Sequence, residues 1–76
     1  MHKAREIIGR NLKACRLACS LSQEELASRA GLHRTYVSSV ERGLRNVTID
    51  NVFALADALG VSPAELIDPD RFDGES

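Results

Sequence analysis

The clearest indications of the fold lie in LSQEELASRAGLHRTYVSSVERG, residues 21–43. Ser22 and Glu25 form a Ser-x-x-Glu capping box, in which each side chain bonds the backbone amide of the other residue and starts a helix. Gly31 can adopt the left-handed backbone conformation that ends a helix, and a second periodic segment follows three residues later and ends before Gly43. This pattern predicts two short helices joined by a tight glycine turn. They are expected over residues 22–30 and 34–42.

Three further helices are expected around this stretch. Apolar residues recur every three or four positions over residues 4–19, which predicts an amphipathic helix there. Thr48 caps another helix over residues 49–59, and Ser62 with Pro63 starts a short one over 63–67. No alternating pattern indicates a strand. The residues expected to face the core are Ile8, Leu12, Cys15, Cys19, Leu26, Ala27, Val37, Val40, Ile49, Val52, Leu55, Ala56 and Leu59.

The 76 residues are enough for one small domain, because two hydrophobic cores would leave each half too little apolar surface to bury. We expect a domain over residues 1–68 and a polar tail, 69–76, that frays. No segment resembles a signal peptide or a membrane span, so a cytoplasmic location is expected. Cys15 and Cys19 are expected to be reduced thiols in the core, because a metal site would need ligands that His2 and His33 are badly placed to supply.

The charges are divided unevenly along the chain. Residues 1–45 carry nine Lys or Arg and four Asp or Glu, a balance of +5, whereas residues 46–76 carry one Arg and seven acids, a balance of −6. The net charge of −1 therefore hides a basic half and an acidic half. Such asymmetry fits a protein with one side that faces phosphate, although solvated charge alone would also produce it.

The expected helix over residues 34–42 has a distinctive outer face. At about 100° per residue, Val37, Val40 and Glu41 share the inner side of this helix. The outer side carries short hydroxyl side chains with an arginine at each end. Short side chains let a helix backbone approach base edges in a DNA groove, and Arg34 can reach guanine O6 and N7 with two hydrogen bonds.

Several short motifs, in matching order and spacing, together resemble the phage Cro/repressor (XRE-type) helix-turn-helix family over residues 8–67. The resemblance implies an all-α, compact five-helix lambda-repressor-like DNA-binding domain, with the helix 34–42 in the major groove. It also implies a homodimer that binds double-stranded DNA at a pseudo-palindromic operator and regulates transcription. The motifs are LSQEELA (21–27), AGL (30–32), YVS (36–38), ERG (41–43) and LADALGV (55–61).

The resemblance assigns roles to individual residues. Base contacts are expected from Arg34, Thr35, Ser38 and Ser39. Backbone contacts are expected from Gln23, Tyr36 and Arg42. Two alternatives stay open, because Tyr36 can instead pack on the first helix and the segment around Gln23 can serve only as a helix cap. Glu41 needs a buried cation, and the family pattern supplies Arg16 as its partner in a structural ion pair.

A narrower similarity is to controller proteins of restriction-modification systems, a compact branch of this family. It rests on the run 34–38 with residues 41–42 and 45–49, and it adds Arg45 and Asn46 as DNA backbone contacts. Two residues depart from the common pattern: His33 stands where a Ser, Thr or Asp cap is usual, and Val47 stands where many relatives have proline. These departures should weaken the helix start and loosen the loop.

A dimer interface is expected on the last two helices, since one small core does not need all of their apolar residues. The candidates are Phe53, Leu66, Ile67 and Phe72, with the alternative that Leu66 and Ile67 complete the monomer core. Two other functions stay open: an antitoxin with a toxin partner, which a neighbouring toxin gene would reveal, and a protein-interaction adaptor without DNA binding. No enzyme, cofactor or metal is expected, and no small-molecule effector is identified.

Overall fold

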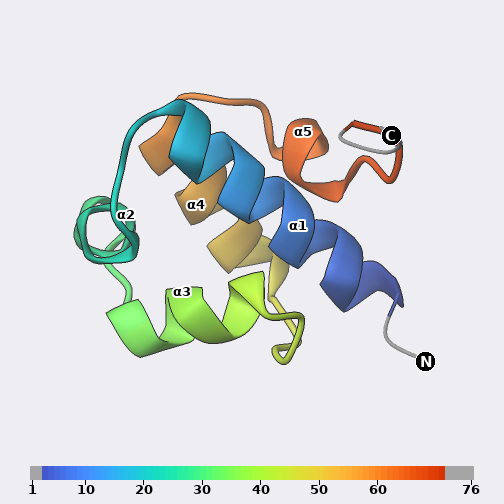
Figure 1. Cartoon of the computed structure of the whole chain (residues 1–76), viewed down its shortest axis with the longest axis horizontal. Coiled ribbons are helices and arrows are strands. Elements are labelled where there is room, and N and C mark those ends of the chain that lie inside the picture. Colours follow the sequence, from blue (N-terminus) through green and yellow to red (C-terminus); the bar gives the residue numbers. More distant parts are fainter. Residues whose placement is uncertain (1–2, 72–76) are drawn as a thin grey trace.

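The computed structural model describes residues 3–71, and Figure 1 shows how the helices are arranged. Within that range the regular secondary structure is entirely helical, as the sequence predicted. The helices are α1 (Lys3–Ala18), α2 (Gln23–Ala30), α3 (Arg34–Glu41), α4 (Ile49–Leu59) and α5 (Pro63–Ile67). Each predicted helix is present. Across the described residues, no helix has both the length and the apolar character that crossing a bilayer requires.

Hydrogen bonds at the first turn of α2 explain where that helix begins. Ser22 Oγ accepts from the Glu25 amide at 3.0 Å, and Glu25 Oε1 accepts from the Ser22 amide at 2.8 Å, so the predicted capping box is confirmed. The bond from the Ser22 amide lowers the pKa of the Glu25 carboxyl group, because it favours the charged form. At the other end, Gly31 has a φ of 71°, the left-handed conformation expected of it.

The helices enclose one apolar core. α1 crosses the molecule and packs against α3, α4 and α5, while α2 packs against α3 and α4 (Figure 1). Removal of the facing side chains from water supplies the main driving force for this arrangement. The buried apolar residues are Leu12, Cys15, Leu21, Leu26, Ala27, Val37, Val40, Val52, Leu55, Ala56, Leu59 and Leu66.

Two residues predicted for the core lie on the surface instead. Cys15 is buried as expected, but Cys19 is exposed, and both are free thiols. α1 ends before Cys19, and Ser20 has a φ of 57°, so the chain has already left the helical path. Ile49, the first residue of α4, is 66% exposed, because this helix reaches the core only at Val52.

Gly9 allows α1 to approach α3 very closely. A Cβ atom added at Gly9 would overlap the carbonyl oxygen of Val40 and would lie 2.8 Å from that of Glu41. The absence of a side chain therefore determines how near the C-terminal end of α3 sits to α1. This close approach sets the position of the helix that is expected to read DNA.

Asn11 and Arg10 on α1 hold the segment that follows α5. The fully buried Asn11 donates from Nδ2 to the carbonyl oxygens of Leu66, at 3.0 Å, and Asp68, at 2.8 Å. Arg10 Nη2 donates to the Pro69 carbonyl oxygen at 2.9 Å. Arg71 Nη2 also lies 2.7 Å from a carboxylate oxygen of Glu65. Pro69 and Arg71, which belong to the tail expected to fray, are thus tied to α1 and α5.

Candidate nucleic-acid interface

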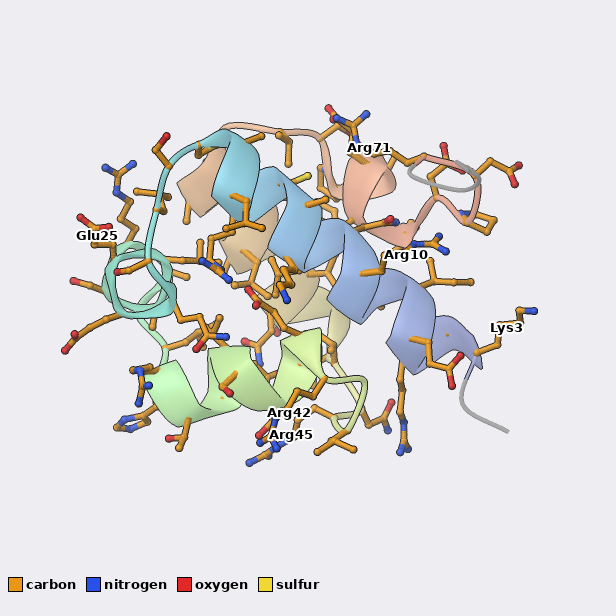
Figure 2. The ribbon with its side chains drawn as sticks, in the orientation of Figure 1. Lys3, Arg10, Glu25, Arg42, Arg45 and Arg71 are labelled. Atoms are coloured by element: carbon orange, nitrogen blue, oxygen red, sulfur yellow. The ribbon has the colours of Figure 1, made fainter. Side chains whose placement is uncertain are left out.

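The outer surface of α3 faces away from the core. It is formed by Arg34, Thr35, Ser38, Ser39 and, directly after the helix, Arg42. Arg34, Thr35 and Arg42 are exposed, and the two serines are half-buried. Val37 and Val40 occupy the inner side and are buried, as the helical rotation predicted. Figure 2 shows Arg42 and Arg45 beside α3, on the opposite side of the molecule from Arg71. The surface can therefore meet a large ligand without any rearrangement of the core.

Ser39 is already bonded within its own helix. Its hydroxyl group donates to the carbonyl oxygen of Thr35 at 2.9 Å, one turn earlier. A serine hydroxyl has a single hydrogen but two lone pairs, so Ser39 retains only the capacity to accept from an outside group.

His33 precedes α3 without capping it. Its backbone is extended, with φ −84° and ψ 146°, but its side chain makes no capping hydrogen bond. Ser22 and Thr48, by contrast, each accept a backbone hydrogen bond at the start of α2 and α4. The first turn of α3 therefore lacks the side-chain support that a Ser, Thr or Asp at this position would give.

The predicted ion pair between Arg16 and Glu41 is present. Arg16 Nε lies 2.6 Å from Glu41 Oε2, and Nη2 lies 3.0 Å from Oε1, so the pair has two parallel hydrogen bonds. The two side chains are 10% and 3% exposed. Arg16 Nη1 also donates to the Leu21 carbonyl oxygen at 2.8 Å. Bonding to Glu41 raises the pKa of Arg16, against the opposing effect of burial.

Gln23 also forms a hydrogen bond with the carboxylate of Glu41. Its Nε2 donates to Glu41 Oε1 at 3.0 Å, so Glu41 binds residues of both α1 and α2. Gln23 is half-buried at the first position of α2. An amide nitrogen has two hydrogens, and one of them is now held by Glu41. This link was not predicted, because the two residues are 18 positions apart in the sequence.

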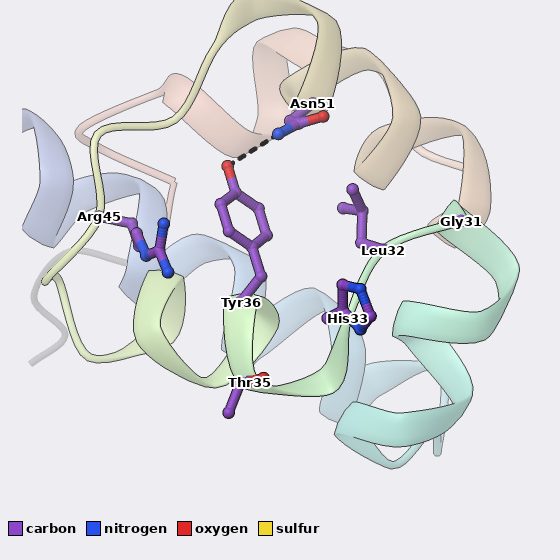
Figure 3. Close-up of a pocket in the computed structure, with 7 residues that line it drawn as sticks. All are labelled: Gly31, Leu32, His33, Thr35, Tyr36, Arg45 and Asn51. Carbon is purple, nitrogen blue, oxygen red and sulfur yellow. Dashed lines mark hydrogen bonds between the residues drawn. The ribbon is translucent and has the colours of Figure 1, made fainter.

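Tyr36 points toward α4 and lines a shallow cavity of about 350 Å³ beside α3 (Figure 3). Its hydroxyl oxygen accepts from Asn51 Nδ2 at 3.0 Å. The guanidinium carbon of Arg45 lies 5.2 Å from the centre of its ring, a cation–π distance. The residues that line the cavity are Gly31, Leu32, His33, Thr35, Tyr36, Arg45 and Asn51. Asn51 was not predicted as a site residue.

The four residues expected at a dimer interface have different positions. Phe53 and Ile67 are 57% and 50% exposed, so both are accessible to a second molecule. Leu66 is fully buried in the monomer core, and its assignment to an interface is therefore wrong. Phe72 lies outside the described residues. The exposed Ile49 precedes Phe53 by one helical turn and so lies on the same face of α4.

Metal ions require groups of ligand side chains. Residues 3–71 contain no group of three or more His, Cys, Asp or Glu side chains placed to hold a metal ion.

A short helix with an exposed polar surface, packed across a second helix after a glycine turn, is the arrangement found in helix-turn-helix DNA-binding transcriptional regulators. Residues 12–66 match the family model described as helix-turn-helix, and the chain belongs to this family, as its motifs predicted.

The curated relatives include control proteins. The chain is 48% identical over 65 residues to control protein C.BamHI of Bacillus amyloliquefaciens, an alignment that covers 84% of this chain and 80% of that protein. It is 48% identical over 63 residues to control protein C.SmaI of Serratia marcescens, with 83% and 75% covered.

Solved structures agree with the fold. The restriction-modification controller protein C.AhdI from Aeromonas hydrophila superposes with a TM-score of 0.80 at 48% identity, over 82% of this chain and 94% of that one. The hypothetical transcription factor NHTF from Neisseria superposes with a TM-score of 0.85 at 41% identity, over 90% and 78%. Over residues 3–71, the five-helix, strand-free architecture is therefore shared with these solved structures.

Proposed function

We propose that the protein binds a pseudo-palindromic operator as a homodimer, with α3 of each subunit in the major groove. The observation that carries this proposal is the outer surface of α3. Its small hydroxyl side chains are accessible while the apolar side of the helix is buried in the core. An α-helix fits the major groove of B-form DNA, and short side chains permit close approach to the base edges.

Base recognition is assigned to the outer surface of α3. Arg34 is exposed at the helix start, where a guanidinium group can bond O6 and N7 of one guanine. The hydroxyl groups of Thr35 and Ser38 can donate or accept hydrogen bonds. The Ser39 hydroxyl group accepts, because its hydrogen is bonded to the Thr35 carbonyl oxygen within the helix. Together these residues would distinguish a few adjacent base pairs.

Backbone contacts are assigned to residues around that surface. Arg42 and Arg45 supply positive charge at the end of α3 and in the following loop, and Asn46 is exposed next to them. Gln23 lies at the amino end of α2, where backbone N–H groups also favour an anion. Tyr36 offers its hydroxyl group from the cavity beside α3. Contacts of this kind fix the orientation of a protein on the duplex.

The size of the molecule supports a dimer. Its longest dimension is 30 Å, whereas half-sites one helical turn apart are separated by about 34 Å. One copy of α3 therefore cannot read both half-sites. Phe53 and Ile67 are the proposed interface residues, and Ile49 is added because it lies on the same face of α4 as Phe53.

The relatives favour one biological setting. They include control proteins C.BamHI and C.SmaI, and the solved structures include the restriction-modification controller protein C.AhdI. We therefore assign this chain to the control of restriction-modification genes, in preference to an antitoxin or a protein-interaction adaptor. Binding to DNA also fits the cytoplasmic location expected from the sequence.

Selection of bound sequences from a random duplex library tests the proposal. We expect the recovered duplexes to contain two inverted copies of a short motif, with centres about 34 Å apart. Affinity for these duplexes should fall steeply with salt concentration, because bound phosphates release counterions. Recovery of no common motif, or binding that salt does not affect, would contradict DNA recognition by this protein.

A further inference from the structure

Asn51 connects α4 to the proposed DNA-binding surface. It lies in the first turn of α4, where its backbone amide donates to Thr48 Oγ1 at 3.2 Å. Its side chain is half-buried and extends toward α3, and Nδ2 donates to the Tyr36 hydroxyl oxygen (Figure 3). The position of Asn51 is thus fixed by the helix cap, while its amide group reaches a residue of the neighbouring helix.

This hydrogen bond determines what the Tyr36 hydroxyl group can do. A tyrosine hydroxyl has one hydrogen to donate and lone pairs that accept. Because Asn51 donates to the oxygen, the hydroxyl hydrogen is not needed for that contact and can point elsewhere. Within residues 3–71, no hydrogen bond from this hydroxyl group to a protein acceptor is present. The hydroxyl group is therefore available as a donor at the wall of the cavity.

The cavity suits an anion. Its wall includes the Tyr36 hydroxyl group and the guanidinium group of Arg45, and none of the described residues that line it is an Asp or Glu. Arg45 is held beside the ring at 5.2 Å. A phosphodiester group carries negative charge and only accepts hydrogen bonds, so it complements these donors.

We propose that Asn51 is a positioning residue that orients the Tyr36 hydroxyl group as a donor to one DNA phosphate bound in this cavity. Asn51 itself does not contact the phosphate. It acts by occupying the acceptor side of the hydroxyl oxygen. This role rests on the proposed function, because it requires that α3 meet DNA.

A double-mutant cycle measures the role directly. The probe is a fluorescently labelled duplex that carries the sequence recovered by selection, and the readout is the Kd from anisotropy. Tyr36→Phe should weaken binding about tenfold, because a hydrogen bond to a charged group is lost. Asn51→Ala should weaken binding by about fivefold alone, but should have no further effect in the Tyr36→Phe background.

The Asn51→Asp variant tests the direction of the hydrogen bond between residue 51 and Tyr36. A carboxylate can only accept, so it would draw the hydroxyl hydrogen toward itself and away from the phosphate. We therefore expect Asn51→Asp to weaken binding more than Asn51→Ala when Tyr36 is present. Circular dichroism melts should show that each variant folds, and Asn51→Ser replaces Asn51→Ala if the latter does not.

A second readout separates this role from a purely structural one. Replacing single phosphates of the duplex by uncharged methylphosphonates should reveal one position at which wild-type protein loses affinity, but at which Tyr36→Phe and Asn51→Ala lose little. Two results would overturn the role of Asn51 while leaving the proposed function intact. The first is an equal loss of affinity on Asn51→Ala substitution in the wild-type and Tyr36→Phe proteins. The second is an Asn51→Ala protein that remains as sensitive as the wild type to the methylphosphonate at that position. A wild-type protein that binds no duplex would overturn the proposed function and this role together.

Discussion

Arg34 stands at the start of α3 with its side chain exposed, so its guanidinium group can reach the floor of a groove. Arg34→Ala should relax discrimination at one base pair and cost about 1–3 kcal/mol on the preferred duplex. Arg42→Ala is the matched control at the other end of the same surface. It should weaken binding to all duplexes by a similar factor, and it should reduce the slope of log affinity against log salt concentration by about 1. Competition binding with single-base variants measures both. A uniform loss with Arg34→Ala would make Arg34 a backbone contact.

Arg16 is the only cation bonded to the buried carboxylate of Glu41 among the described residues. Arg16→Ala should destabilise the fold by about 3–5 kcal/mol, because it leaves a buried charge without its partner. Chemical denaturation with urea measures the change in unfolding free energy. Lys13→Ala, on the exposed side of the same helix, should change it little. A midpoint for Arg16→Ala equal to that of the wild type would refute the stabilising role of the pair.

The capping box makes the start of α2 sensitive to acid. The pKa of Glu25 is lowered in the folded protein, so its charged form contributes stability above the ordinary value of 4.5. That contribution should disappear as the pH falls through the lowered pKa of the folded state. The Tm advantage of the wild type over Glu25→Gln should therefore shrink in acid. Thermal melts across a pH series test this, with Glu24→Gln as the control for loss of a first-turn charge. A constant Tm difference would contradict the linkage.

The contact between α1 and α3 depends on one missing side chain. In an exposed helix, Gly→Ala is stabilising by about 1 kcal/mol. At Gly9 the added Cβ would overlap the backbone of α3, which cannot move as a flexible side chain can. Gly9→Ala should therefore destabilise the protein by about 1–3 kcal/mol, and should also weaken DNA binding by displacing α3. Denaturation and binding assays measure the two effects. Greater stability with unchanged binding would show that the helices separate without cost.

Local signals predicted the helices well. Capping residues, a glycine at a helix end and apolar spacing all act within a few residues, so the sequence places the helices within one residue of their bounds. The links between helices were harder to predict. Asn11 bonds a carbonyl 55 positions away, and Asn51 bonds Tyr36 across 15 positions. The Arg16–Glu41 pair was predicted only because a family pattern supplied the partner.

Helical periodicity also has a definite limit. It assigns a residue to one face of a helix, but it does not say where along the helix that face meets the core. Ile49 lies on the apolar stripe of α4 and yet is exposed, because the helix reaches the core one turn later. Leu66 was expected at an interface for a different reason, namely that one small core did not need all the apolar residues of the last two helices, and the structure buries it completely.

The distribution of charge over the whole molecule is more informative than the net charge. α1, α2 and α3 belong to the basic part of the chain, and α4 and α5 belong to the acidic part. A positive potential around α3 would steer DNA toward its outer surface, because phosphates respond to local charge at short range. Apart from the first turn of α4, which reaches the cavity beside α3 through Asn51, the acidic helices would then lie away from the phosphates, where they are free to contact a second subunit.

This arrangement leads to a prediction about assembly. Phe53 is 57% exposed on α4, so Phe53→Arg should leave the monomer folded while placing charge in the proposed interface. Sedimentation equilibrium should show a shift from dimer to monomer, and affinity for the full operator should fall while affinity for one half-site changes little. Leu17→Arg is the matched control, because Leu17 is 56% exposed but lies on α1. A Phe53→Arg protein that stays dimeric would move the interface away from this face of α4.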